Sequence, residues 1–240
     1  MSQPPMSSAE VSVNGQSGPH AAAPGRGVRV TVPMTTGPEK AARDLAPRLR
    51  ALAGEAAPAS SQRVGTNAGA ERAHQGAPAS SIDRRADGAS APDERAPRRV
   101  PVVTIDGYSG SGKSTLAAAL ARLLPSWQVL HLDDWYPGWD GLAQGAEVAR
   151  RIAADLREGR TSSYVTWDWE TNTSGRAVEV PLAPTIIEGC GACEADADLS
   201  VWIADPGEAE RRRRALARDG ATYAPHWQRW AMQDRGRSID

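Results

Sequence analysis

Residues 107–115 read Gly-Tyr-Ser-Gly-Ser-Gly-Lys-Ser-Thr, and this stretch decides the fold. It fits the pattern G-x-x-x-x-G-K-[ST], in which glycines let successive backbone N–H groups converge on a phosphate. The lysine can reach the outer phosphates, the following serine hydroxyl can hold Mg²⁺, and the helix that comes next favours an anion at its N-terminus. The residues expected to cradle phosphates are Gly107, Ser109, Gly110, Ser111, Gly112, Lys113, Ser114 and Thr115.

The segments on either side of this loop have the composition that the motif needs. Residues 100–106 form a short, β-rich apolar run, and residues 116–124 are strong helix formers that Pro125 stops. The chain has only two lysines against 26 arginines, and one of the two is Lys113, which suggests that a compact ammonium is needed there. Strand, glycine loop and helix favour a phosphate loop over the alternative, a Gly/Ser-rich turn before a helix.

The first 98 residues differ in composition from the rest of the chain. They contain 11 of the 18 prolines and none of the 12 aromatic residues. Such a segment cannot bury enough apolar surface to offset its chain entropy, so we predict a disordered Ala-, Pro-, Ser-, Gly- and Arg-rich tail over residues 1–98. Within it, residues 38–53 have leucines at helical spacing, although Pro47 interrupts them. Residues 99–240 have the usual size of one domain.

Charge and hydropathy exclude several kinds of partner. The formal net charge is −1, and the arginines of the first 98 residues are scattered, which does not indicate a nucleic-acid partner. No apolar stretch is long enough to span a membrane, and the N-terminus lacks the pattern of a secretory signal. We therefore expect a cytoplasmic protein with neither a nucleic-acid nor a membrane partner, and the oligomeric state stays open.

Four apolar runs after residue 99 lead into acidic residues, and segments of helical composition separate them. This alternation predicts an α/β fold, a three-layer sandwich with a mostly parallel sheet of four to five strands. In such sheets ligands lie beyond the carboxyl ends of the strands, so these acids should share an edge with the phosphate loop. Asp205 before Pro206 has the pattern of a helix cap, whereas Asp133 and Glu188 are better candidates for contacts with Mg²⁺ and with an acceptor.

Four further motifs follow the phosphate loop in a fixed order. They are a strand ending in acids and an aromatic pair (130–136), the triplet Trp167-Asp168-Trp169, a strand ending Glu-Gly (185–189) and an arginine-rich run (211–219). Over about residues 100–230 this order resembles the uridine kinase-like P-loop kinases, within the nucleoside and nucleotide kinase group. The resemblance implies that residues 99–240 form a P-loop kinase-like domain, which uses ATP and Mg²⁺ and phosphorylates a small hydroxyl acceptor.

The resemblance also implies roles for individual residues. Asp133 matches the base that activates the acceptor, Glu188 joins Ser114 as a Mg²⁺-side ligand, and Arg214 and Arg218 join Lys113 in stabilising the transferred phosphoryl group. The residues expected to contact the acceptor are Asp133, Tyr136, Trp167 and Asp168.

Each of these roles has a plainer alternative. Asp133 could be an outer-sphere Mg²⁺ ligand or a helix cap, the arginines could form a solvated helix face, and the tryptophans of the triplet could cover the core in an edge strand.

The chain also departs from this family. Relatives continue past the arginine-rich run into a short strand that helps form the adenine pocket, whereas this chain reaches only Asp240, which suggests four strands or an altered or truncated C-terminus. The segment 136–140 (Tyr-Pro-Gly-Trp-Asp) replaces a His-Pro-Asp-type segment, so the acceptor need not be uridine or cytidine. Cys190 and Cys193 have C-x₂-C spacing, but a structural zinc site needs four ligands and no second pair exists.

Two other functions fit the same motifs. The protein could be a nucleotide-binding ATPase or switch that acts on a protein partner, with the N-terminal segment as its docking arm. It could also be a degraded relative that binds nucleotide and catalyses nothing.

Overall fold

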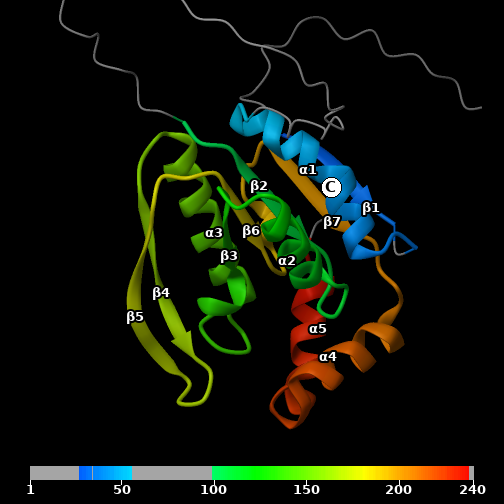
Figure 1. The fold of residues 1–240 in the computed structure, drawn as a ribbon. Helices are drawn as coiled ribbons and strands as arrows, with labels where there is room; N and C mark the ends of the chain where they lie inside the picture. Colours follow the sequence, from blue (N-terminus) through cyan, green and yellow to red (C-terminus); the bar gives the residue numbers. More distant parts are fainter. Residues whose placement is uncertain (1–26, 34, 56–98, 238–240) are drawn as a thin grey trace, which may run out of the picture.

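The strand that leads into the phosphate loop lies at the centre of a parallel sheet. The computed structural model describes residues 27–33, 35–55 and 99–237. In it, β2 (Val102–Asp106) lies between β7 (Leu199–Ile203) and β6 (Thr185–Glu188), and the full order is β1-β7-β2-β6-β3. All five residues of β2 are buried, because helices cover both faces of the sheet (Figure 1). The outer strands are β1 (Val28–Val32) and β3 (Gln128–His131).

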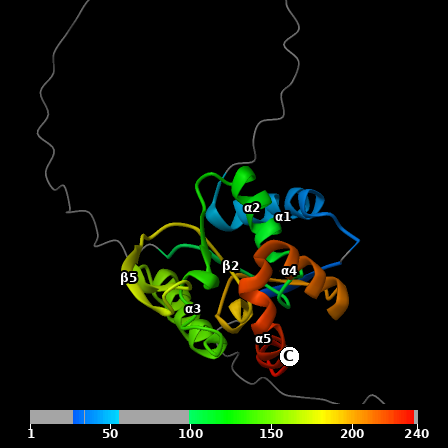
Figure 2. The same ribbon diagram turned by 90° about the horizontal axis from the view of Figure 1, so that it is seen from below.

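Alternate residues of the central strands point into two separate apolar layers. Val103 and Ile105 of β2 face the layer formed with α1 (Pro38–Ala53) and α2 (Lys113–Leu123). Val102 faces the opposite layer, which contains α3 (Leu142–Arg157) and α5 (Trp227–Arg235). Figure 2 shows α1 and α2 on one side of β2 and α3 with α5 on the other. The predicted α/β fold with a three-layer, parallel-sheet sandwich is thus confirmed.

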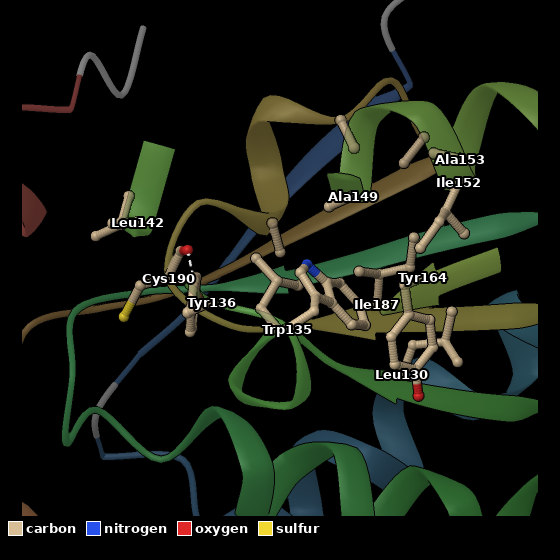
Figure 3. Close-up of a cluster of buried hydrophobic side chains, with 14 of the residues drawn as sticks. Leu130, Trp135, Tyr136, Leu142, Ala149, Ile152, Ala153, Tyr164, Ile187 and Cys190 are labelled. Atoms are coloured by element: carbon tan, nitrogen blue, oxygen red, sulfur yellow. Dashed lines mark hydrogen bonds between the residues drawn. The ribbon is translucent and has the colours of Figure 1, made fainter. Parts of the chain in front are cut away.

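The layer on the α3 side is built largely from aromatic and branched side chains. Trp135 packs on Tyr164 with ring centroids 4.7 Å apart, and Leu130 and Ile187 lie beside them (Figure 3). The Tyr136 hydroxyl donates a hydrogen bond of 2.7 Å to the backbone carbonyl of Cys190. Because a buried hydroxyl needs such a partner, this bond fixes the position of the Tyr136 side chain near the phosphate loop.

The elements β1 and α1 are part of the folded sheet and its helical cover, which corrects the prediction of a disordered tail over residues 1–98. β1 pairs in parallel with β7 along its whole length, and α1 packs against α2. Leu45 and Leu49 of α1 lie on its buried face, whereas Leu52 is exposed. Pro47 also lies on the exposed face, where it does not disturb the packing. The domain therefore begins well before residue 99, and the rest of the predicted tail lies outside the described residues.

This N-terminal segment supplies the fifth strand of the sheet. β1 occupies the edge beside β7, so the sheet has five strands although the described chain adds none after the arginine-rich segment. Arg50 near the end of α1 donates a 2.6 Å hydrogen bond to the carbonyl oxygen of Leu123 at the end of α2. The segment is thus held by strand pairing, apolar packing and a polar contact.

The remaining elements surround the carboxyl end of the sheet. An antiparallel hairpin, β4 (Ser162–Asp168) and β5 (Thr173–Val180), follows α3 and forms a separate two-stranded sheet. The arginine-rich segment is α4 (Glu208–Tyr223), which contains a kink at Gly220 (φ 55°, ψ −132°). Short 3₁₀ turns cover Leu132–Asp134, Ala192–Glu194 and Ala224–His226. Among the described residues, no helix is both long and apolar enough to cross a membrane.

Candidate active site

The phosphate loop connects β2 to α2 and depends on its glycines for shape. Gly110 has φ +80°, and a Cβ there would lie 2.3 Å from the backbone oxygen of Arg211, so no larger residue fits. Gly112 precedes α2 with φ +106°, and a Cβ there would meet no atom within 4 Å. One glycine therefore permits close packing under the loop, while the other leaves open space above the helix N-terminus, where an anion is favoured.

The underside of the loop is fixed by α4 and α5. The backbone N–H of Ser109 donates a 2.8 Å hydrogen bond to Asp234, and the Ser109 hydroxyl accepts one of 2.9 Å from Tyr223. Ser109 was predicted to face the phosphates, but these bonds occupy its amide and hydroxyl with partners in the protein. Ser111 differs, because its hydroxyl oxygen is buried without a hydrogen-bond partner among the described residues. An unpaired buried hydroxyl in this position fits a loop that binds a polar ligand.

Lys113 is buried at the first turn of α2 with its ammonium inside the loop. It donates hydrogen bonds of 2.8 Å and 3.2 Å to the carbonyls of Gly107 and Tyr108, and lies 3.3 Å from the sulfur of Cys190. Burial lowers the pKa of Lys113, but Cys190, Asp234 and other nearby acidic groups outweigh burial and raise the pKa above its usual value. Lys113 is therefore a fixed positive charge at neutral pH.

Asp133 and Glu188 meet at one cavity of about 560 Å³, together with Lys113 and Ser114. The two carboxylates follow neighbouring strands, since β3 pairs with β6. Glu188 is buried and accepts a 2.6 Å hydrogen bond from Nδ1 of His131, and this bond raises the pKa of the imidazole. The structure thus brings together both predicted carboxylates and the loop that was predicted to hold phosphates.

Asp133 has the electrostatics of a group that can accept a proton. Asp133 is exposed to solvent and lines the cavity, while nearby protein atoms desolvate its carboxylate and raise its pKa. The charge of Glu188 raises the pKa of Asp133 further, and the charges of Lys113 and Arg218 oppose that shift. A carboxylate with a raised pKa holds a proton more readily, which is the property that a general base requires.

Three arginines of α4, spaced three and four residues apart, occupy different environments. Arg218 lines the Asp133 cavity and makes a bidentate pair with Asp219, with both contacts at 2.7 Å. Arg214 pairs with Glu210 at 2.7 Å and lines a second cavity, described below. Arg211 is buried and donates to Asp205 at 2.8 Å, so it fixes α4 instead of facing a ligand.

The far wall of the Asp133 cavity is aromatic. Trp139 stacks on Tyr223 (5.2 Å between centroids, 11° between planes) and lies 4.7 Å from Trp169. The indole N–H of Trp169 donates a 2.8 Å hydrogen bond to the backbone carbonyl of Asp133, which ties the hairpin to the site. Trp230 and the predicted residue Tyr136 complete this wall. The sequence signal for Trp139 is its place in the unusual segment 136–140; Tyr223 and Trp230 carry no such signal.

Two predicted acceptor residues do not line this cavity. Asp168 accepts hydrogen bonds from the backbone N–H groups of Glu170 and Thr171 (2.9 and 3.1 Å), so it organises the turn of the hairpin. Trp167 lies beside Gly138 and is not among the residues that line the cavity. Of the triplet, Trp169 is the member that reaches the cavity, because it follows the last residue of β4 and lies in the turn of the hairpin, where the alternation of strand faces no longer holds.

Asp106, Cys190 and Cys193 have structural roles around the site. Asp106 is buried, accepts a 2.6 Å hydrogen bond from the N–H of Gly107 and pairs with Arg237 at 2.8 Å. Burial raises the pKa values of Cys190 and Cys193 to about 12, so both are neutral thiols at neutral pH. Among the described residues there is no group of three or more His, Cys, Asp or Glu side chains placed to hold a metal ion by themselves.

Of the comparisons with known proteins, only the one with solved structures finds similar proteins. No family model and no curated protein matches this chain. It is similar to a possible uridine kinase from Bacillus stearothermophilus, with 22% identity over 52% of this chain and 82% of that one, at a TM-score of 0.37. It is also similar to a candidate fructose transport system kinase from a Silicibacter species, with 24% identity over 58% and 81% of the two chains, at a TM-score of 0.40. The function proposed next rests on the geometry of the site.

Proposed function

We propose that this protein is a kinase that transfers the γ-phosphoryl group of ATP to a hydroxyl group of a small molecule. The observation that carries the proposal is the single cavity in which Lys113, Ser114, Asp133, Glu188 and Arg218 meet. These are the parts that phosphoryl transfer needs: a phosphate cradle, oxygen ligands for Mg²⁺, a base and a cation beside the transferred group. These residues converge from four different elements, which is not expected of a loop that only reverses the chain direction.

The loop and Lys113 would hold the phosphate chain of ATP. Amide groups at the start of α2 and the open space at Gly112 fit an anion, and Lys113 can exchange its hydrogen bonds to loop carbonyls for phosphate oxygens. Ser114 and Glu188 offer oxygen atoms, which suit Mg²⁺. Mg²⁺, when bound with the nucleotide, neutralises negative charge on the phosphate oxygens.

Asp133 would act as the general base. The acceptor oxygen attacks the γ-phosphorus, its proton passes to a carboxylate oxygen of Asp133, and the bond between the γ-phosphorus and the bridging oxygen breaks, releasing ADP. Arg218 lines the same cavity and would stabilise the negative charge that spreads over the oxygens of the transferred phosphoryl group. Arg214 faces the neighbouring cavity, so its predicted catalytic role is weaker than that of Arg218.

The acceptor would lie against the aromatic wall. Trp139, Trp169 and Trp230 give a broad apolar surface, while Asp133 and Asp219 offer acceptors for hydroxyl protons. Rings that carry hydroxyl groups have one apolar face and polar edges, so they match such a wall. This favours a cyclic polyol, such as a sugar or the sugar of a nucleoside, as the class of acceptor.

A panel of hydroxyl compounds tests the proposal. ADP production from Mg·ATP by the full chain is measured with nucleosides, nucleoside monophosphates, pantothenate and sugars, and we expect one class to stimulate it. Asp133→Asn should remove the stimulated rate, whereas Asp134→Asn, the adjacent carboxylate outside the cavity, should retain it. ADP production that no compound stimulates would instead identify an ATPase or switch, and ATP binding without turnover would identify a non-catalytic relative.

A further inference from the structure

A second cavity adjoins the phosphate loop and has no role in the chemistry described above. Its volume is about 550 Å³, and it shares Gly110, Lys113, Ser114 and Arg218 with the Asp133 cavity. A ligand lying along the loop can therefore extend into both. Cavities of this size are typical of small-molecule sites.

One wall of this second cavity comes from the N-terminal segment. Val32 ends β1, and Pro33, Thr36, Gly37 and Pro38 lead into α1, and all of them line the cavity. The segment lies far from the loop in sequence, and the pairing of β1 with β7 and the packing of α1 on α2 bring it there.

The facing wall is formed by α4, with Arg214 and Ala215, while Ile203 and Leu116 add apolar surface. A flat, partly apolar group fits between such walls, because a guanidinium group stacks on aromatic faces and proline rings pack against them. The loop residues between the two cavities bind phosphates in the proposed function. The γ-phosphate must face Asp133 in the first cavity, so the other end of the nucleotide must lie toward the second.

We propose that the residues between the end of β1 and the first turn of α1 that line this cavity (Val32, Pro33, Thr36, Gly37, Pro38 and Ala41) form the binding site for the nucleoside half of the nucleoside triphosphate. The proposal rests on the proposed function, since it requires a triphosphate on the loop. It assigns a ligand to a segment that precedes the phosphate loop and whose composition predicts disorder. It also makes nucleotide binding depend on the docking of that segment, because the base contacts both the loop and α1.

Gly37 gives a direct test. It lines the cavity with φ −61°, a conformation open to any residue, and a Cβ there would meet no atom within 4 Å. Gly37→Trp therefore fills the cavity without disturbing the backbone, while Gly37→Ala adds only a methyl group. Lys40→Trp is the matched control, because it places the same ring on an exposed position of α1 outside the cavity.

Binding of Mg·ATP and of Mg·triphosphate, which lacks the nucleoside, is measured by calorimetry on the full chain. We expect the wild type, Gly37→Ala and Lys40→Trp to bind ATP at least about tenfold more tightly than triphosphate. In Gly37→Trp the two ligands should bind equally, with triphosphate affinity unchanged. An ATP preference that survives in Gly37→Trp would overturn the inference, as would equal binding of the two ligands by the wild type.

Photolabelling provides a second readout that does not depend on the rotamer of the new tryptophan. ATP with an azido group on its base should label the peptide that contains residues 33–41, and excess ATP should prevent the labelling. Labelling confined to other peptides would overturn the inference while leaving the kinase proposal intact. Failure of both ATP and triphosphate to bind would overturn the proposed function and this inference together.

Discussion

Replacing Leu49 by alanine tests whether the N-terminal helix is part of the folded core. Leu49 is 0% exposed and belongs to the apolar layer between α1, α2 and the sheet. Removing a fully buried leucine side chain costs about 2–5 kcal/mol of unfolding free energy, because apolar contacts are lost and a cavity is left. Leu52, three residues further along the same helix, is 38% exposed, so Leu52→Ala should cost less than about 1 kcal/mol.

The assay is urea unfolding followed by tryptophan fluorescence, with thermal unfolding as a second measure. For a chain of this size 1 kcal/mol corresponds to about 2–4 °C, so a 3 kcal/mol loss predicts a Tm about 6–12 °C lower for Leu49→Ala and a small change for Leu52→Ala. Equal unfolding midpoints for Leu49→Ala, Leu52→Ala and the wild type would refute the assignment of α1 to the core. The tryptophans all follow residue 126, so they report on the sheet to which α1 is attached.

Three further predictions concern the site. Because desolvation and the charge of Glu188 raise the pKa of Asp133, kcat/KM should fall at low pH around a value above that of an ordinary aspartate, and Asp133→Asn should lose this acid limb along with most of the activity. Gly110→Ala should destabilise the fold and abolish nucleotide binding, since the new Cβ would lie 2.3 Å from the Arg211 carbonyl; calorimetry and thermal unfolding measure both effects. The bond to Glu188 raises the pKa of His131, so its stabilisation should be full below the unfolded pKa and lost as the pH rises through the folded pKa. Urea unfolding of wild type and His131→Gln across this range should show the difference shrinking with pH.

Specific controls accompany these measurements. Asp134→Asn should keep the acid limb of the pH–rate profile. If this variant lost the acid limb, the limb could not be assigned to Asp133. Gly112→Ala places its Cβ in open space, although φ there is +106°, so it should unfold at a higher temperature than Gly110→Ala. The reverse order would contradict the packing of α4 under the loop. A stability difference for His131→Gln that grows with pH would contradict the charged pair with Glu188.

Much of the sheet could be predicted because its central strands carry local signals. The four apolar runs that lead into acids are β2, β3, β6 and β7, and each is short, continuous and bounded by turns. β1 lacks such a signal, since at the sheet edge only Val32 among its five residues is buried. The leucines of α1 do show helical spacing in the sequence, but their burial depends on α2, a partner distant in sequence, and the composition of the first 98 residues favours disorder.

The site shows the same division between local and long-range information. Lys113, Ser114, Asp133 and Glu188 could be predicted because each lies at the carboxyl end of a strand or at the turn that follows, and parallel strands bring those ends together. Arg211 and Arg214 are three residues apart in α4, which is the spacing of one helix face, but spacing does not say what packs against that face. Likewise, the aromatic wall joins residues from separate elements, which only the folded chain brings into contact.

Transfer of label from [γ-³²P]ATP tests the central claim most directly. The full chain, Asp133→Asn and Asp134→Asn are incubated with Mg·ATP and the acceptor panel, and the products are separated by chromatography. We predict that the label appears on a hydroxyl compound with wild type and Asp134→Asn, and that Asp133→Asn transfers at most a small fraction of it. Label found only in inorganic phosphate, at the same rate with and without every acceptor, would contradict the assignment of this site to a kinase.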